Sequence, residues 1–201
     1  MIGLALAVFF LIITPGPGVL TTAGFGAAYG FKRSLPYVFG LFIGTNLVLL
    51  AVVSGFAAVL LSVPWLRTVL VLASLAFLLY LAAKIAFAGS KIAFIAATTP
   101  PGIVGGILLQ IVNPKAYAVN TTLVTGFNYA PDAFAFEVTT KLLIINAVWI
   151  PIHLIWLWAG VRLHALNLSE SRQRLINFAM AAALLTVVLL SVYSLLSSEF
   201  Q

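Results

Sequence analysis

Long apolar stretches, separated by short polar connections, account for most of the chain. Six of these stretches come close to the ~20 residues that an α-helix needs to cross a bilayer. They run approximately over Ile2–Gly24, Leu35–Ser62, Leu66–Phe87, Gly102–Phe127, Phe134–Gly160 and Leu175–Leu196. The pattern predicts an all-α polytopic membrane protein with six transmembrane helices.

Two of the six stretches are interrupted near the middle by a proline motif, at matching places in the two halves of the chain. The motifs are Thr14-Pro15-Gly16-Pro17 and Asn113-Pro114-Lys115-Ala116. A proline inside a helix removes one backbone donor and clashes with the preceding turn. Irregular backbone at membrane depth is tolerated only where it is buried in protein or lines a cavity. Broken helices in corresponding positions of two halves are typical of a transporter's binding site.

Basic residues are distributed unevenly among the connections between the stretches. The second connection holds Arg67 alone and the fourth holds none, whereas the first, third and fifth together hold Lys32, Arg33, Lys84, Lys91, Arg162, Arg172 and Arg174. Lysine and arginine are enriched in cytoplasmic loops, so we expect the odd connections to be cytoplasmic and both termini to lie outside. With three spans in each half, the second half would enter the membrane from the opposite side. This predicts one transporter domain, 1–201, of two inverted three-helix repeats, approximately 1–90 and 100–201.

Composition agrees with a membrane protein and excludes several other classes. Apolar residues make up 63% of the 201 and charged residues only 7%, whereas a soluble domain carries about 25% charged residues. The net charge of +6 lies mostly at segment ends, which favours membrane topology over nucleic-acid binding. The chain has no cysteine, so disulfides, thiol catalysis and cysteine-based metal sites are excluded, and we expect no metal and no cofactor. The opening segment lacks a basic n-region, so we expect it to be a retained span.

Lys115 is the most informative single residue. It lies about 20 Å along the fourth stretch from Gly102, at 1.5 Å per residue. An ionisable residue at that depth is costly and is by default a functional candidate. Lys115 has no acidic residue at its depth, because every Asp and Glu of the chain falls near the end of a stretch. It could receive a substrate carboxylate, exchange a proton, or hold freed carbonyls as a purely structural staple; we favour a functional role.

Polar and aromatic residues at helical spacing predict a lining for the site. One face of the fourth stretch carries Gln110, Asn113, Tyr117 and Asn120, one face of the fifth carries Asn146, Trp149, His153 and Trp156, and the second adds Thr45 and Asn46. Interhelical packing is an equally good explanation for any one of these side chains. His153 could carry a proton near neutral pH, although a lone histidine is more often structural. We expect Lys141 to pair with Glu137 and to extend outward.

The two proline motifs resemble those of the LysE/RhtB family of amino-acid exporters. The segments Ala73–Lys84 and Gly102–Asn113 are also similar to that family, and the resemblance covers essentially the whole chain. It implies a multi-pass protein of the bacterial inner membrane that exports amino acids or related small metabolites from the cytoplasm, driven by the proton gradient.

The residues and the resemblance together predict a secondary active exporter that works by alternating access at a midplane site between the first and fourth spans. Gly16 and Gly18 would let the substrate approach the backbone. The substrate-binding candidates are Thr14, Pro15, Gly16, Pro17, Asn46, Asn113, Pro114, Lys115, Tyr117, Asn120, Asn146 and Trp149. The candidates for proton coupling are Lys115 and His153. The partners are a small molecule, protons and the lipid bilayer.

Other classes fit the sequence less well. A channel would use pore-lining rings or a filter, and one pair of broken helices indicates a single occluded site. An intramembrane enzyme would need a nucleophile with its base or a metal cluster, and the span centres offer neither, so we expect no enzymatic activity. A membrane scaffold does not explain Lys115 between two breaks. The small-residue patches Gly24-Phe25-Gly26 and Gly102–Gly106 permit close packing within the chain or between subunits of a homo-oligomer.

The charges predict a preference among amino acids. A basic substrate side chain would be expected to meet an acidic partner in the membrane, and the span centres hold none. We therefore expect export of neutral amino acids, or of an anionic metabolite, and not of basic amino acids. Efflux of radiolabelled amino acids from preloaded cells measures this. Export of lysine or arginine without any export of neutral amino acids would contradict it.

Overall fold

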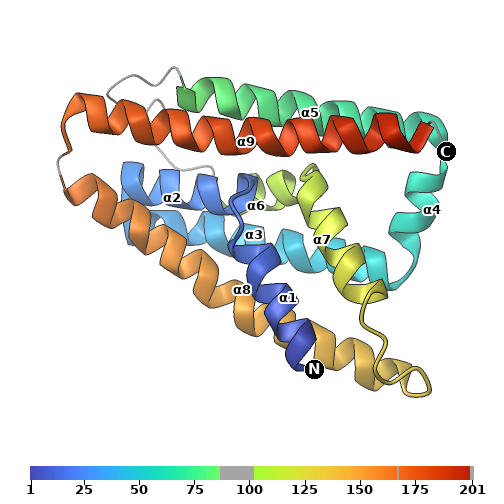
Figure 1. Cartoon of the computed structure of the whole chain (residues 1–201). Helices are drawn as coiled ribbons and strands as arrows, with labels where there is room; N and C mark the ends of the chain where they lie inside the picture. The colour runs from blue at the N-terminus through green and yellow to red at the C-terminus, as the bar shows by residue number, and fades with distance from the viewer. Residues whose placement is uncertain (87–101, 167, 200–201) are drawn as a thin grey trace.

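The computed structural model describes residues 1–86, 102–166 and 168–199, and over these ranges the chain is helical, without strands. Figure 1 shows two long helices lying side by side above a group of crossing helices, of which two pairs are bent. The helices are α1 (Ile2–Ile13), α2 (Pro17–Tyr29), α3 (Phe31–Val53), α4 (Phe56–Ser62), α5 (Pro64–Ala86), α6 (Gly102–Ile111), α7 (Pro114–Thr125), α8 (Phe134–Ala165) and α9 (Glu170–Glu199).

The helices follow the predicted stretches, and the chain breaks at both proline motifs. The first stretch is the pair α1–α2, bent by 54°, and the fourth is the pair α6–α7, bent by 64°. Among the described residues, α3 and the Phe134–Leu163 part of α8 are each long and apolar enough to cross a membrane, and the count rises to four if each bent pair is one span. The six-span architecture therefore stays a prediction.

The second stretch, predicted as one span over Leu35–Ser62, differs from the prediction. Helix α3 ends at Val53, and Gly55 adopts a left-handed conformation with φ of 74° before the short helix α4 begins. Glycine takes this conformation without the penalty that a Cβ brings, which is why it terminates helices so often. The predicted connection Ala88–Pro101, with Lys91, lies outside the described residues, as does Phe87.

The helices of the two halves pack in a crossed manner. Helix α3 packs along α6 and α7, α8 packs along α2 and α1, and α5 packs on α9. The first long helix of each half, α3 or α8, thus lies against the broken pair of the other half (Figure 1). Two interlocked repeats would pack in this way. The division into inverted repeats and their orientation in a membrane remain predictions.

Glycines allow the two main crossings to be close. Gly26 and Gly160 lie where α2 crosses α8, and Gly40 and Gly106 lie where α3 crosses α6. A Cβ placed on any of these four residues would overlap backbone atoms of the facing helix. Small residues that let helix backbones touch are the usual means of packing helices in lipid. The two small-residue patches of the sequence therefore serve contacts within the chain, at Gly26 and Gly106.

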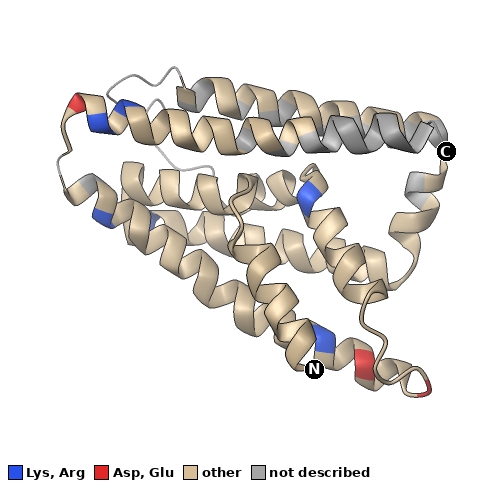
Figure 2. Cartoon of the chain, viewed as in Figure 1, with Lys and Arg blue, Asp and Glu red and all other residues tan. Residues whose placement is uncertain are grey.

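Most charged residues lie toward the ends of the helical assembly. Figure 2 shows basic residues near the end of α8 and both charge signs at the start of α9, at one end of the molecule, and both charge signs near the start of α8 at the other. Lys115, at the start of α7, lies between the two ends. The basic residues at the first end include Arg162, Arg172 and Arg174. These three arginines belong to the predicted fifth connection, and the placement of that connection on the cytoplasmic side stays a prediction.

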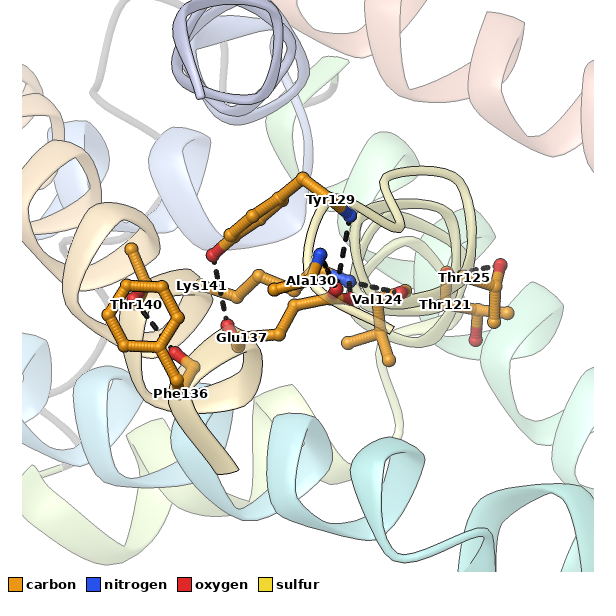
Figure 3. Close-up of polar contacts among 9 residues, drawn as sticks. All are labelled: Thr121, Val124, Thr125, Tyr129, Ala130, Phe136, Glu137, Thr140 and Lys141. Carbon is orange, nitrogen blue, oxygen red and sulfur yellow. Dashed lines mark hydrogen bonds and ion pairs between the residues drawn. The ribbon is translucent and has the colours of Figure 1, made fainter. Parts of the chain in front are cut away.

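One buried ion pair ties α7 to the start of α8 (Figure 3). Glu137 Oε2 accepts hydrogen bonds from the backbone N–H of Tyr129, at 3.0 Å, and of Ala130, at 2.7 Å. Lys141 Nζ lies 2.6 Å from Glu137 Oε1 and donates to the carbonyl oxygen of Val124, also at 2.6 Å. The predicted pairing is confirmed, but the predicted outward extension of Lys141 is wrong, because only 3% of this residue is exposed. The carbonyl in the last turn of α7 lacks a helical partner, and Lys141 turns inward to satisfy it.

We expect Glu137→Ala to lower the melting temperature in detergent by on the order of 5–10 °C, because it leaves Lys141 and two backbone N–H groups without their acceptor. Glu137→Gln keeps an acceptor oxygen and should lose less. The matched control is Glu170→Ala, which removes a pair of the same spacing that is exposed and 3.7 Å apart, and which should change little. Equal losses in Glu137→Ala and Glu170→Ala would contradict the anchoring role.

Candidate functional site

The first break is an extended segment between two helices. Helix α1 ends at Ile13, Gly16 is extended with φ of −161°, and Pro17 occupies the first position of α2. A proline there is favourable, since its missing N–H would have no helical partner anyway. The Thr14 hydroxyl donates to the Phe10 carbonyl oxygen at 2.5 Å. The Thr14 carbonyl oxygen accepts a hydrogen bond from Lys115 Nζ, which comes from the other half of the chain.

The second break is organised by an asparagine. Asn113 is the N-cap of α7, its Oδ1 accepting from the backbone N–H of Lys115 at 3.1 Å, and Pro114 follows as the first helical residue. Asn113 Nδ2 donates to Gln110 Oε1 at 2.8 Å, and Gln110 Nε2 donates to Thr45 Oγ1 at 2.5 Å. These bonds link the break to α3. A buried side-chain amide without a hydrogen-bond partner would be costly, so these bonds of Asn113 and Gln110 stabilise the bend between α6 and α7.

Lys115 joins the two breaks. Its Nζ bonds the carbonyl of Thr14, and its stem passes over Gly16, where a Cβ would lie 2.7 Å from Lys115 Cδ. A side chain at position 16 would therefore displace the lysine from this path between the broken helices. An ammonium group carries three donors, and the bond to Thr14 uses one of them. Among the ion pairs of the described residues, none involves Lys115.

A cavity of about 60 Å³ opens between the breaks. On the same measure of volume, a cavity needs about 10–15 Å³ to hold one buried water molecule. This cavity is therefore larger than a site for a single water. Its wall is formed by six helices: α1, α2, α3, α6, α7 and α8. The lining residues are Leu11, Ile12, Gly16, Gly18, Val19, Thr45, Gln110, Asn113, Lys115, Ala116, Val119, Asn120, Ile145, Trp149 and His153. It reaches α8 halfway along the helix.

His153 and Trp149 form one wall of the cavity. Their rings are stacked with centroids 3.6 Å apart at 14°, and His153 Nδ1 lies 3.0 Å from the carbonyl oxygen of Trp149. A carbonyl oxygen only accepts, so Nδ1 carries the hydrogen, and Nε2 is an acceptor while the imidazole is neutral. A Cβ placed on Gly18 would lie 3.5 Å from Nε2, which therefore lies toward the cavity.

The structure brings together part of the predicted set. Gly16, Asn113, Lys115, Asn120 and Trp149 line the cavity, together with the proton-coupling candidate His153. Thr14, Pro15, Pro17 and Pro114 shape the breaks, and only the Thr14 carbonyl contacts Lys115.

Three predicted binding residues lie away from the cavity lining. Asn46 and Asn146 hydrogen-bond each other reciprocally at 3.0 and 2.9 Å, which links α3 to α8 and agrees with the packing alternative. Tyr117 is half-buried and does not line the cavity, since the 64° bend interrupts the helical face on which its spacing to Gln110 was based.

Sequence reasoning did not select the apolar part of the wall. Leu11, Ile12, Val19, Val119 and Ile145 line the cavity, and such residues cannot be told from ordinary core residues by pattern. Gln110 and Thr45 belong to the polar lining expected from helical spacing but not to the predicted binding set. The sequence signal for them is a polar side chain inside an apolar helix. Among the described residues, no group of three His, Cys, Asp or Glu side chains could hold a metal ion.

Comparison with known proteins finds a family match. The family model described as LysE type translocator matches residues 9–196, which include both breaks and every residue of the cavity wall. No curated protein and no solved structure matches the chain.

We expect Asn113→Ala to destabilise the protein by ~1–2 kcal/mol, because it removes the N-cap of α7 and the partner of Gln110. Asn113→Ser keeps a capping oxygen and should recover part of this loss. Denaturant or thermal unfolding in detergent measures both, with Asn128→Ala in the exposed α7–α8 loop as the control. A serine variant as unstable as the alanine variant would contradict the capping role.

Proposed function

The chain belongs to the LysE type translocator family, and from this premise we propose that it is a secondary active exporter of neutral amino acids or related small metabolites. A translocator family is a family of membrane transporters. The observation that supports a carrier site in this chain is the bond of Lys115 to the carbonyl freed at the opposite break, on the wall of a cavity that combines polar and apolar side chains.

The substrate carboxylate binds Lys115 in this proposal. A carboxylate is a stronger acceptor for an ammonium group than the neutral carbonyl of Thr14, because hydrogen bonds between charged partners are roughly twice as strong. The α-ammonium group of the substrate would donate to His153 Nε2 and to the side-chain oxygen of Asn120, both on the cavity wall. A neutral side chain would rest against Val119 and Ile145.

Transport proceeds by alternating access between the two proposed inverted repeats. Lys115 connects the repeats through Thr14, so a substrate that binds Lys115 changes the contact that joins them. The crossed packing of α3 on α6 and of α8 on α2 supports a motion of one half against the other around a fixed central site. Export runs from the cytoplasm across the bacterial inner membrane, with the odd connections on the cytoplasmic side.

Of the two candidates for proton coupling, Lys115 and His153, we propose that His153 carries the proton in antiport. A neutral His153 accepts the substrate ammonium at Nε2, whereas a protonated imidazole is a cationic donor at both nitrogens and repels it. Proton binding and substrate binding therefore exclude each other at one residue, as antiport requires. At Lys115 the relation is reversed, because the protonated ammonium attracts the carboxylate and the deprotonated amine does not. Of the two candidates, His153 is therefore the one at which proton and substrate exclude each other.

We expect Lys115→Ala to reduce substrate counterflow in membrane vesicles at least tenfold, while Lys115→Arg retains part of it, since a cation remains near the carboxylate. Counterflow of labelled amino acids is measured at equal amounts of protein in the membrane. It distinguishes a carrier from a scaffold or an enzyme, neither of which shows it.

Two results would count against the proposal. If Lys115→Ala exchanges substrate as fast as the intact protein, the lysine is a structural staple and the carboxylate binds elsewhere. If the intact protein moves no amino acid and no other small anion, the exporter assignment itself fails.

A further inference from the structure

Gly18 lies in the first turn of α2 and lines the cavity between His153 and Gln110. It differs in one respect from the glycines at the helix crossings. A Cβ on Gly26 or Gly160 would overlap the backbone of the facing helix, whereas a Cβ on Gly18 meets its nearest neighbours at 3.5 and 3.7 Å. Those are ordinary van der Waals distances. Packing between helices therefore does not require a glycine at this position.

Backbone conformation does not require a glycine at position 18 either. Among the described residues, positive φ angles occur at Gly30, Gly55 and Gly102, and Gly18 is not one of them. In this helical conformation alanine is favoured over glycine, because glycine loses more conformational freedom on folding. Neither of the usual structural reasons for a glycine applies, and the space beside Gly18 belongs to the cavity.

We propose that Gly18 sets the upper size of the substrate side chain that the cavity accepts. This inference rests on the proposed function and deepens it. The two atoms nearest to a Cβ at position 18 are His153 Nε2 and Gln110 Nε2, both on the cavity wall, so an added methyl group would occupy space that the substrate uses. In a cavity of about 60 Å³, one methyl group is a substantial share of the volume.

Gly16 is not an equivalent size determinant. A Cβ there would lie 2.7 Å from Lys115 Cδ, so a substitution would displace the lysine and affect every substrate that carries a carboxylate. The nearest neighbours of a Cβ at Gly18 are His153 on α8 and Gln110 on α6, and not Lys115. A change at Gly18 should therefore alter selectivity while the carboxylate position is kept.

The test compares Gly18→Ala with the intact protein in counterflow of labelled glycine and alanine against labelled leucine and phenylalanine. The control is Gly3→Ala, the same change at an exposed position of α1 where a Cβ meets only Phe127 at 4.0 Å. We expect the ratio of large to small substrates to fall at least tenfold in Gly18→Ala and to stay unchanged in Gly3→Ala, with a melting temperature in both that is no lower than that of the intact protein. An unchanged ratio in Gly18→Ala overturns the proposal.

A second measurement does not depend on the substrate, so it separates failure of this inference from failure of the exporter assignment. The chain has no cysteine, and Gly18→Cys therefore introduces a single thiol. We expect that thiol to react with 2-aminoethyl methanethiosulfonate and to react at least tenfold more slowly with a bulky biotin maleimide. Equal rates with both reagents, or no reaction with the small one, would show that position 18 does not border a size-limited cavity.

Discussion

Backbone polar groups that lose their helical partners inside an apolar environment must find others, and the centre of this protein depends on that constraint. Each break frees backbone groups where no water from the bilayer is at hand. At the first break the Thr14 carbonyl is satisfied by Lys115, and at the second the N–H of Lys115 is satisfied by Asn113. The same residue thus completes both breaks. Polar chemistry is concentrated midway along the helices because the breaks need it there.

Helix α7 is held at both ends by lysines that serve different purposes. Lys115 at its start bonds the carbonyl of Thr14, and Lys141 of α8 bonds the carbonyl of Val124 near its end. Lys141 also has Glu137 as a counter-ion, and that carboxylate is held by two backbone donors. The Lys141 end is therefore fully compensated in charge, whereas Lys115 bonds a neutral carbonyl. An ammonium group that bonds a neutral carbonyl, as Lys115 does, is more available to an anionic ligand than one that already has a carboxylate partner, as Lys141 does.

Close helix crossings set the size of the central cavity. Gly26 against α8 and Gly40 against α6 bring helix backbones into contact, so little space is left at the crossings themselves. The extended segment at Gly16 and the bend before Asn113 separate the helices again, and the cavity occupies that gap. Glycine has two environments in the same helix: Gly26 lies where the helices touch, and Gly18 borders the cavity.

The all-helical class, the two breaks and the pairing of Glu137 with Lys141 could be predicted from the sequence, because they follow from local chemistry: apolar length, proline geometry and i,i+4 spacing. The tertiary structure alone decided which polar side chains share a cavity. Asn46 and Asn146 have the same chemistry as Asn120, yet they pair with each other while Asn120 faces the cavity. The 64° bend removes Tyr117 from the face predicted by spacing, and Lys141 turns inward to a carbonyl 17 residues away. Helical periodicity describes the faces of one straight helix. The partner of a buried polar group is a residue on the helix that crosses it at that level, and the position of this crossing depends on the whole fold.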